Sequence, residues 1–162
     1  MVEVTQALAF MEQQYAQFVA LAHDGRTPYR WQFRLMRYVA QEGRWPDRIS
    51  VPTASGKTSV IDIHVFLNAM VGLAEDESRK EHEILSCLPL RRIPRRLALT
   101  VNRRSLVDDQ FDEADELCGK IHTSESMIHY KEGLKLRAGV HDGLPHTDKP
   151  SVMNVVELRG GI

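Results

Sequence analysis

Cysteine is scarce in this chain. Cys87 and Cys118 are the only two among 162 residues, and they show no CxxC spacing. A small secreted fold held together by disulfide bonds needs many more cysteines than this. We therefore expect both to be reduced thiols with a structural role.

Long apolar runs are also missing. No window approaches the roughly 18 apolar residues that a membrane-spanning helix requires. The N-terminal stretch MVEVTQALAFMEQQYAQF is interrupted by Glu3, Glu12 and several glutamines, so it does not resemble a targeting leader. These absences predict a cytoplasmic protein with no membrane partner.

Neither sign of charge dominates. Lysine and arginine number 21 against 22 aspartate and glutamate, so no global positive field indicates a nucleic-acid partner. Any such site must be a local patch. The 43% of hydrophobic and 27% of charged residues are typical of an ordinary globular protein, and the length suits one compact domain.

What the chain does have is a clear helical periodicity in several stretches. Apolar residues recur at helical spacing over 4–21, ahead of the Asp24-Gly25 breaker. A second stretch, Tyr29–Ala40, follows Pro28, and a third runs from about Ser105 to Lys120. We expect a helix in each, and another that begins at about Lys57.

Three short apolar runs predict β-strands: Arg48–Val51, Leu97–Val101 and Val152–Leu158. Helical segments separate them, which implies right-handed crossovers and a mainly parallel sheet. A Gly/Pro/His-rich loop, Gly139–Pro150, precedes the third run. The fold class expected from this order is α/β, with helices flanking the sheet.

The strongest chemical signal is the segment Pro52–Thr58, which reads PTASGKT. A triphosphate is bound by backbone N–H groups at a helix N-terminus, by a lysine ammonium group and by a hydroxyl that coordinates Mg²⁺. Gly56, Lys57 and Thr58 supply these groups in the required order. The segment therefore predicts a site for ATP and Mg²⁺, with Thr58 as the metal ligand; the alternative is a surface turn before an ordinary helix.

The full phosphate-loop pattern has a glycine where this chain has Val51. Helicases of superfamily 2 commonly replace that glycine, and Val51–Thr58 resembles their version of the loop. The resemblance implies a RecA-like domain in which Gln32 reads the adenine edge, with Tyr29 nearby. Without the loop, Gln32 would simply be a polar residue on an amphipathic helix. The expected nucleotide-binding residues are Tyr29, Gln32, Thr53, Ala54, Ser55, Gly56, Lys57 and Thr58.

Two further segments are candidates for nucleic-acid contact. Arg103 and Arg104 follow a predicted strand and open a helix, which resembles the second helicase motif. Arg159 and Gly160 follow the last apolar run in the sequence LRGG, where glycine permits close approach to a phosphate. The alternatives are two solvated or ion-paired arginines and a plain turn at the end of a strand.

Taken in order, these motifs resemble the CRISPR-associated helicase-nuclease of type I systems, in the subtype lettered G and formerly U. The resemblance covers about 29–162 and implies an ATP-driven translocase. Its implied partners are single-stranded DNA, an RNA-guided CRISPR surveillance complex, a second helicase lobe and a nuclease domain. We expect an N-terminal helix over 1–27 and a partial first helicase lobe over 28–162, incomplete as a RecA-like unit.

Hydrolysis of ATP also needs an acidic pair that holds Mg²⁺ and water, and we find none. Glu157 stands alone in its run, and Asp62 falls inside the helix after the loop. His23-Asp24 and His141-Asp142 lie beside glycines in predicted loops and lack further ligands, so neither predicts a nuclease metal site. We expect the chain alone to bind nucleotide with negligible turnover.

Other classes of protein also fit parts of the pattern. Transferases that prenylate a tRNA adenine contain the string PTASGKT, but near their start and followed by an Asp-Ser-x-Gln-x-Tyr segment that is absent here. Small P-loop kinases show the complete glycine pattern, against which Val51 argues. A non-catalytic remnant or interaction module is the remaining alternative.

Overall fold

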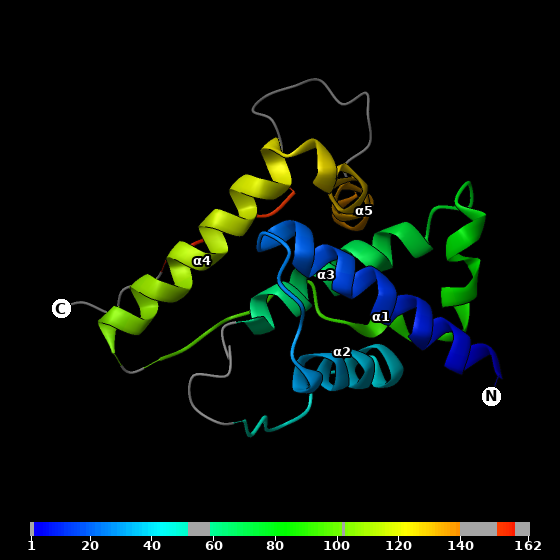
Figure 1. The fold of residues 1–162 in the computed structure, drawn as a ribbon, viewed down its shortest axis with the longest axis horizontal. Coiled ribbons are helices and arrows are strands. Elements are labelled where there is room, and N and C mark those ends of the chain that lie inside the picture. The colour runs from blue at the N-terminus through cyan, green and yellow to red at the C-terminus, as the bar shows by residue number, and fades with distance from the viewer. Residues whose placement is uncertain (1, 52–58, 102, 140–151, 158–162) are drawn as a thin grey trace.

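The computed structural model describes residues 2–51, 59–101, 103–139 and 152–157, and every regular element in these ranges is helical (Figure 1). Three short 3₁₀ segments, η2 (Lys80–Cys87), η3 (Leu90–Arg92) and η4 (Glu125–Met127), join the longer helices. The α-helices are α1 (Val2–Ala22), α2 (Arg30–Glu42), α3 (Val60–Ala74), α4 (Arg104–Thr123) and α5 (Ile128–Ala138).

Helix α3 forms the centre of the molecule. Its sequence, VIDIHVFLNAMVGLA, is apolar on nearly every side, and all residues from Ile61 to Leu73 are buried. A helix without a polar face has to be covered all round. Helices α1, α2 and α5 and the segment η2 supply that cover, and α5 makes the most extensive contact with it.

Aromatic rings from three helices meet at the middle of α3. The ring of Phe66 lies 5.2 Å from that of Tyr15 and 5.7 Å from that of Phe18, both on α1. Tyr130 of α5 packs edge-on against Phe18, with ring centroids 5.0 Å apart. Such contacts bury large apolar areas and fix α1 and α5 against the same point of α3.

Helices α3 and α5 cross at two glycines. A Cβ atom placed on Gly72 would lie 1.8 Å from the carbonyl oxygen of Gly133, and one on Gly133 would lie 2.2 Å from that of Ala69. No side chain fits at either position, so the two helix backbones are in direct contact. This close approach explains why α5 covers α3 so completely.

A buried network of hydrogen bonds connects the segment just before Leu97 to helices α3 and α5. Arg137 of α5 donates from Nε to Oδ1 of Asn68 (3.2 Å) and from Nη2 to the carbonyl oxygen of Ile93 (2.7 Å). Asn68 of α3 donates from Nδ2 to the carbonyl oxygen of Pro94 (3.1 Å). The buried side chains of Arg137 and Asn68 thereby gain hydrogen-bond partners, as burial favours.

The expected α/β fold class, a RecA-like domain with a mainly parallel sheet, is wrong: the described residues contain helices and no strand. The runs 48–51 and 97–101 form no strand, and neither does the described part of the third run, 152–157, whose first two residues form a bend. Within the predicted strand Leu97–Val101, Leu97 and Leu99 are 37% and 38% exposed, whereas a strand inside a parallel sheet would be buried. The physical reason is that α3, rather than a sheet, buries the apolar faces of the surrounding helices.

The predicted helices, in contrast, are confirmed. The stretches 4–21, 29–40 and 105–120 correspond to α1, α2 and α4 within one to three residues at each end. Helix α2 ends at Gly43, whose positive φ of 68° places it in the left-handed conformation that closes a helix and favours glycine. Helical periodicity was therefore a reliable signal in this chain.

Candidate nucleotide site at the start of helix α3

The segment Pro52–Thr58 lies outside the described residues. The nucleotide-binding roles of Thr53, Ala54, Ser55, Gly56, Lys57 and Thr58, and the Mg²⁺ role of Thr58, therefore stay predictions. The described chain resumes at Ser59, which directly precedes α3. The predicted phosphate loop thus leads into the most deeply buried helix of the molecule.

Gln32 of α2 contacts Ser59 directly. Its side-chain Nε2 donates a hydrogen bond to Oγ of Ser59, and its Oε1 accepts one from the backbone N–H of Tyr29 at 2.8 Å. Gln32 is only 5% exposed, so these contacts are shielded from water. The structure therefore places Gln32, which is predicted to bind nucleotide, in contact with Ser59, 27 residues away and directly after the predicted phosphate loop.

Tyr29 stands at the N-cap of α2, and its side chain is 54% exposed. An exposed aromatic ring offers a face on which a planar base can stack. The amide of Gln32 has two N–H groups and two lone pairs, and its bonds to the described residues Tyr29 and Ser59 use one of each. The donor and acceptor of an amide match the pattern of an adenine edge.

The sequence did not reveal an ion pair at the same helix end. His23, just after α1, lies with Nε2 2.8 Å from Oδ2 of Asp62 in the first turn of α3. The side chain of Asp62 is 9% exposed and that of His23 is 30% exposed. The sequence predicts His23 in a loop and Asp62 in a helix. No local signal indicates that they pair, because they are 39 residues apart.

The electrostatics of this helix end follow from that pair. The hydrogen bond to Asp62 raises the pKa of His23 above its usual value, although burial acts in the opposite direction. A protonated His23 balances the carboxylate of Asp62, which would otherwise oppose an anion at the start of α3. The partial positive charge of the helix N-terminus then remains effective for a phosphate.

The residues predicted to contact nucleic acid lie elsewhere. Arg103 is the N-cap of α4 and Arg104 its first residue, and both are exposed. Figure 1 shows that α4 begins at the opposite end of the long axis from the N-terminus. Arg159 and Gly160 lie outside the described residues. The contact of all four with DNA stays a prediction.

The described residues contain neither a cluster of metal ligands nor a membrane-spanning helix. Within the ranges that the structure describes, no three histidine, cysteine, aspartate or glutamate residues gather closely enough to hold a metal ion. None of the helices described is long and apolar enough to cross a membrane.

Comparisons of the chain with protein-family models, with curated proteins and with solved structures found no match. The features of this chain that indicate a function are therefore the motif at 52–58 and the residues that the fold places next to it.

Proposed function

We propose that this chain is the ATP-binding part of an ATP-dependent DNA helicase or translocase of a CRISPR interference system. The observation that carries the proposal is the contact between Gln32 and Ser59. It places the predicted adenine-binding residue beside the residue that follows the predicted phosphate loop. A surface turn with a coincidental SGKT string has no reason to be coupled to α2 in this way.

The chemistry assigned to the site needs a loop and a well-anchored helix rather than a sheet. In the proposal, Lys57 binds the β and γ phosphates, Thr58 coordinates Mg²⁺, and the backbone N–H groups at the start of α3 complete the phosphate site. Burial of α3 on all sides holds that helix end in a fixed position. Tyr29 and Gln32 provide the surface for the adenine.

Turnover should be slow in this chain alone. Phosphoryl transfer to water needs a carboxylate that positions Mg²⁺ and the attacking water. Asp62 is the acidic residue in the first turn of α3, and its carboxylate is already bound to His23. The proposal therefore includes ATP binding without appreciable hydrolysis.

A non-catalytic interaction module is a second candidate, and exposed apolar side chains favour it. They lie in the runs before 52, before 102 and near 155, and exposed apolar side chains commonly contribute to protein interfaces. The exposed members are Ile49, Leu97, Leu99 and Val156. A chain with this function would bind no nucleotide.

Gln32→Ala tests the proposal by calorimetric titration with Mg-ATP and Mg-GTP. We expect the wild-type chain to prefer ATP, and the variant to lose that preference with an affinity for ATP lower by about tenfold, the low end of one bidentate base contact. Gln41→Ala, at an exposed glutamine of the same helix, is the matched control and should bind like the wild type.

Because Gln32 also supports the start of α2, Gln32→Glu should accompany it. The carboxylate can still accept from the Tyr29 N–H, but it cannot donate to Ser59 or to adenine. The account expects a folded variant without ATP preference. Equal affinities for ATP and GTP in the wild-type chain would refute the adenine assignment.

A further inference from the structure

Helix α2 carries three arginines on one exposed face. Arg30, Arg34 and Arg37 follow the spacing i, i+4 and i+7, which places them in a single row along the helix. All three are exposed. We call this row the arginine stripe. It is a local positive feature in a chain whose net charge is −1.

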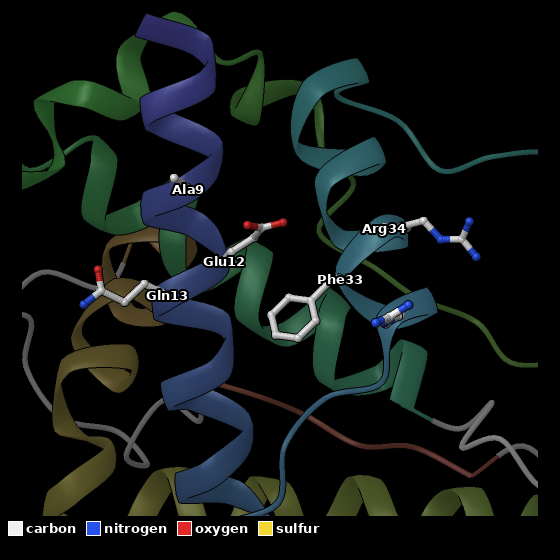
Figure 2. A pocket seen from close by; sticks show the side chains of 6 residues that line it. Ala9, Glu12, Gln13, Phe33 and Arg34 are labelled. Atoms are coloured by element: carbon white, nitrogen blue, oxygen red, sulfur yellow. The ribbon is translucent and has the colours of Figure 1, made fainter. Parts of the chain in front are cut away.

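A groove runs beside the arginine stripe, between α1 and α2. One part has a volume of about 770 Å³, and a second of about 370 Å³ adjoins it and shares three lining residues. Figure 2 shows Phe33 directed into the space between the two helices and Arg34 projecting from α2 on the other side. The residues that line the groove include Glu12, Phe33, Arg34, Arg37 and Tyr38.

The charge of this surface is largely unneutralised. Among the described residues, Glu12 is the one acidic residue that lines either part of the groove, and it binds Arg37 with an N–O distance of 3.0 Å. Arg30 and Arg34 form no ion pair with any described residue. Among the described residues, no carboxylate competes for the guanidinium groups of Arg30 and Arg34. The guanidinium group of Arg37 forms one exposed ion pair, with Glu12.

Aromatic side chains flank the arginines. Tyr38 is 37% exposed, and Phe33 is half-buried in the groove, where its ring packs edge-on against Tyr15. Alternating cations and ring faces are typical of surfaces that bind single-stranded nucleic acid, because phosphates bind the cations and bases stack on the rings. An acidic peptide would match the arginines but would gain little from the rings.

We propose that the arginine stripe and the adjoining groove bind single-stranded DNA, with phosphates on Arg30, Arg34 and Arg37 and a base against Tyr38. Successive stripe positions are separated by about 6 Å and about 4.5 Å along the axis, from the 1.5 Å rise of a helix, so each arginine can reach a different phosphate oxygen. The choice of DNA rests on the proposed function. The stripe adds the surface along which the strand lies, on the helix that also carries Gln32.

The test is fluorescence anisotropy of a labelled oligothymidylate with the full chain across a range of salt concentrations. Arg34→Ala/Arg37→Ala should weaken binding by at least about tenfold at low salt and reduce the salt slope by about 1.4, or 0.7 for each lost phosphate contact. The matched control is Arg91→Ala/Arg96→Ala, which also removes one arginine paired with a glutamate (Arg91–Glu75) and one with no ion pair. An equal loss in the control would overturn the proposal in favour of bulk charge.

Two further arms make the assignment specific. Tyr38→Ala should weaken binding by at least about fivefold and Tyr38→Phe should restore it, because stacking needs the ring and not the hydroxyl. Polyglutamate should compete far less well than unlabelled oligothymidylate of the same charge. Competition of equal strength, or no effect of either tyrosine variant, would overturn the assignment to nucleic acid.

The same variants separate this inference from the proposed function. Arg34→Ala/Arg37→Ala should bind Mg-ATP like the wild type, and Lys57→Ala should bind the oligonucleotide like the wild type. If the stripe variant loses DNA binding but the wild-type chain binds no ATP, the proposed function is refuted and the inference about the arginine stripe is retained. If ATP binds and the stripe variant holds DNA unchanged, the stripe fails alone.

Discussion

At the scale of single residues, the pair of His23 and Asp62 controls the charge at the start of α3. The hydrogen bond that His23 donates to the carboxylate of Asp62 raises the pKa of His23 in the folded chain above its unfolded value of about 6.5. A histidine with a raised pKa stabilises the fold fully below its unfolded pKa, and that stabilisation is lost as pH rises through the folded pKa.

Asp62→Asn should therefore destabilise the chain by about 1 kcal/mol at pH 6, a low value for a charge-assisted hydrogen bond because His23 is partly exposed. The deficit should shrink above the folded pKa of His23. Urea unfolding at pH 6 and pH 8.5 gives the two stabilities, and NMR titration of the His23 ring gives its pKa. A deficit that does not change with pH, or an unchanged His23 pKa in the variant, would contradict this assignment.

Residue-level predictions from the sequence were possible only where a local pattern carried the information, and the nucleotide-binding roles stay predictions. PTASGKT is recognisable because its residues are contiguous, and Gln32 because it stands at a characteristic position ahead of that loop. The contact of Gln32 with Ser59 and that of His23 with Asp62 span 27 and 39 residues. No local sequence pattern indicates either contact, so both could be identified only in the folded structure.

At the scale of elements, the crossing of α3 and α5 depends on the absence of side chains at Gly72 and Gly133. Gly72→Ala should destabilise the chain by about 3 kcal/mol or more, because the new methyl group would meet backbone rather than a movable side chain. Urea unfolding would measure the loss.

Gly119→Ala is the matched control for that substitution. Gly119 is also a helical glycine, but a Cβ atom there would meet nothing within 4 Å. We expect a gain of about 0.5–1 kcal/mol from the better helix propensity of alanine. Similar effects at Gly72 and Gly119 would mean that α3 and α5 do not cross as closely as described.

Element type was predictable for helices and not for the three apolar runs. A helix can be recognised in the sequence because its 3.6-residue period repeats over many residues, as in α1 and α2. A run of four to seven apolar residues fits a strand or an extended connection equally well, because strand formation depends on a partner elsewhere in the chain. The run 97–101 has the composition of a strand and no pairing partner among the described residues.

At the scale of the whole molecule, the central helix α3 packs against α1, α2 and α5. Phe66 of α3 is fully buried and contacts rings from α1 and α5. Phe66→Ala should lower the free energy of unfolding by about 3–5 kcal/mol, as expected when a large core ring is removed.

Unfolding should remain a single transition in both the wild type and this variant. Circular dichroism reports all helices, whereas tryptophan fluorescence reports the neighbourhood of Trp31 and Trp45, in and just after α2. Coincident transitions by the two probes would show that α2 folds together with α3. Separate transitions would mean that the arginine stripe and the predicted phosphate loop belong to independently folding parts.

The whole-molecule architecture was the part that sequence reasoning missed. The alternation of three apolar runs with helical segments indicated an α/β fold, and the family that the sequence resembles has a sheet beside its phosphate loop, so both signals led to the wrong fold class. The residues of α3 already contained the contrary signal, since a helix with no polar face indicates a helical core around it. The chemistry proposed for the loop is independent of that error, because it needs the start of a helix and not a strand.

The most direct test of the account is calorimetric titration of the purified chain with Mg-ATP, beside Lys57→Ala. Lys57 supplies the cation for the β and γ phosphates, so its removal should abolish measurable binding while the chain stays folded. The account predicts saturable ATP binding by the wild-type chain and none by the variant. Equal binding by both, or no binding by the wild-type chain, would contradict the central claim.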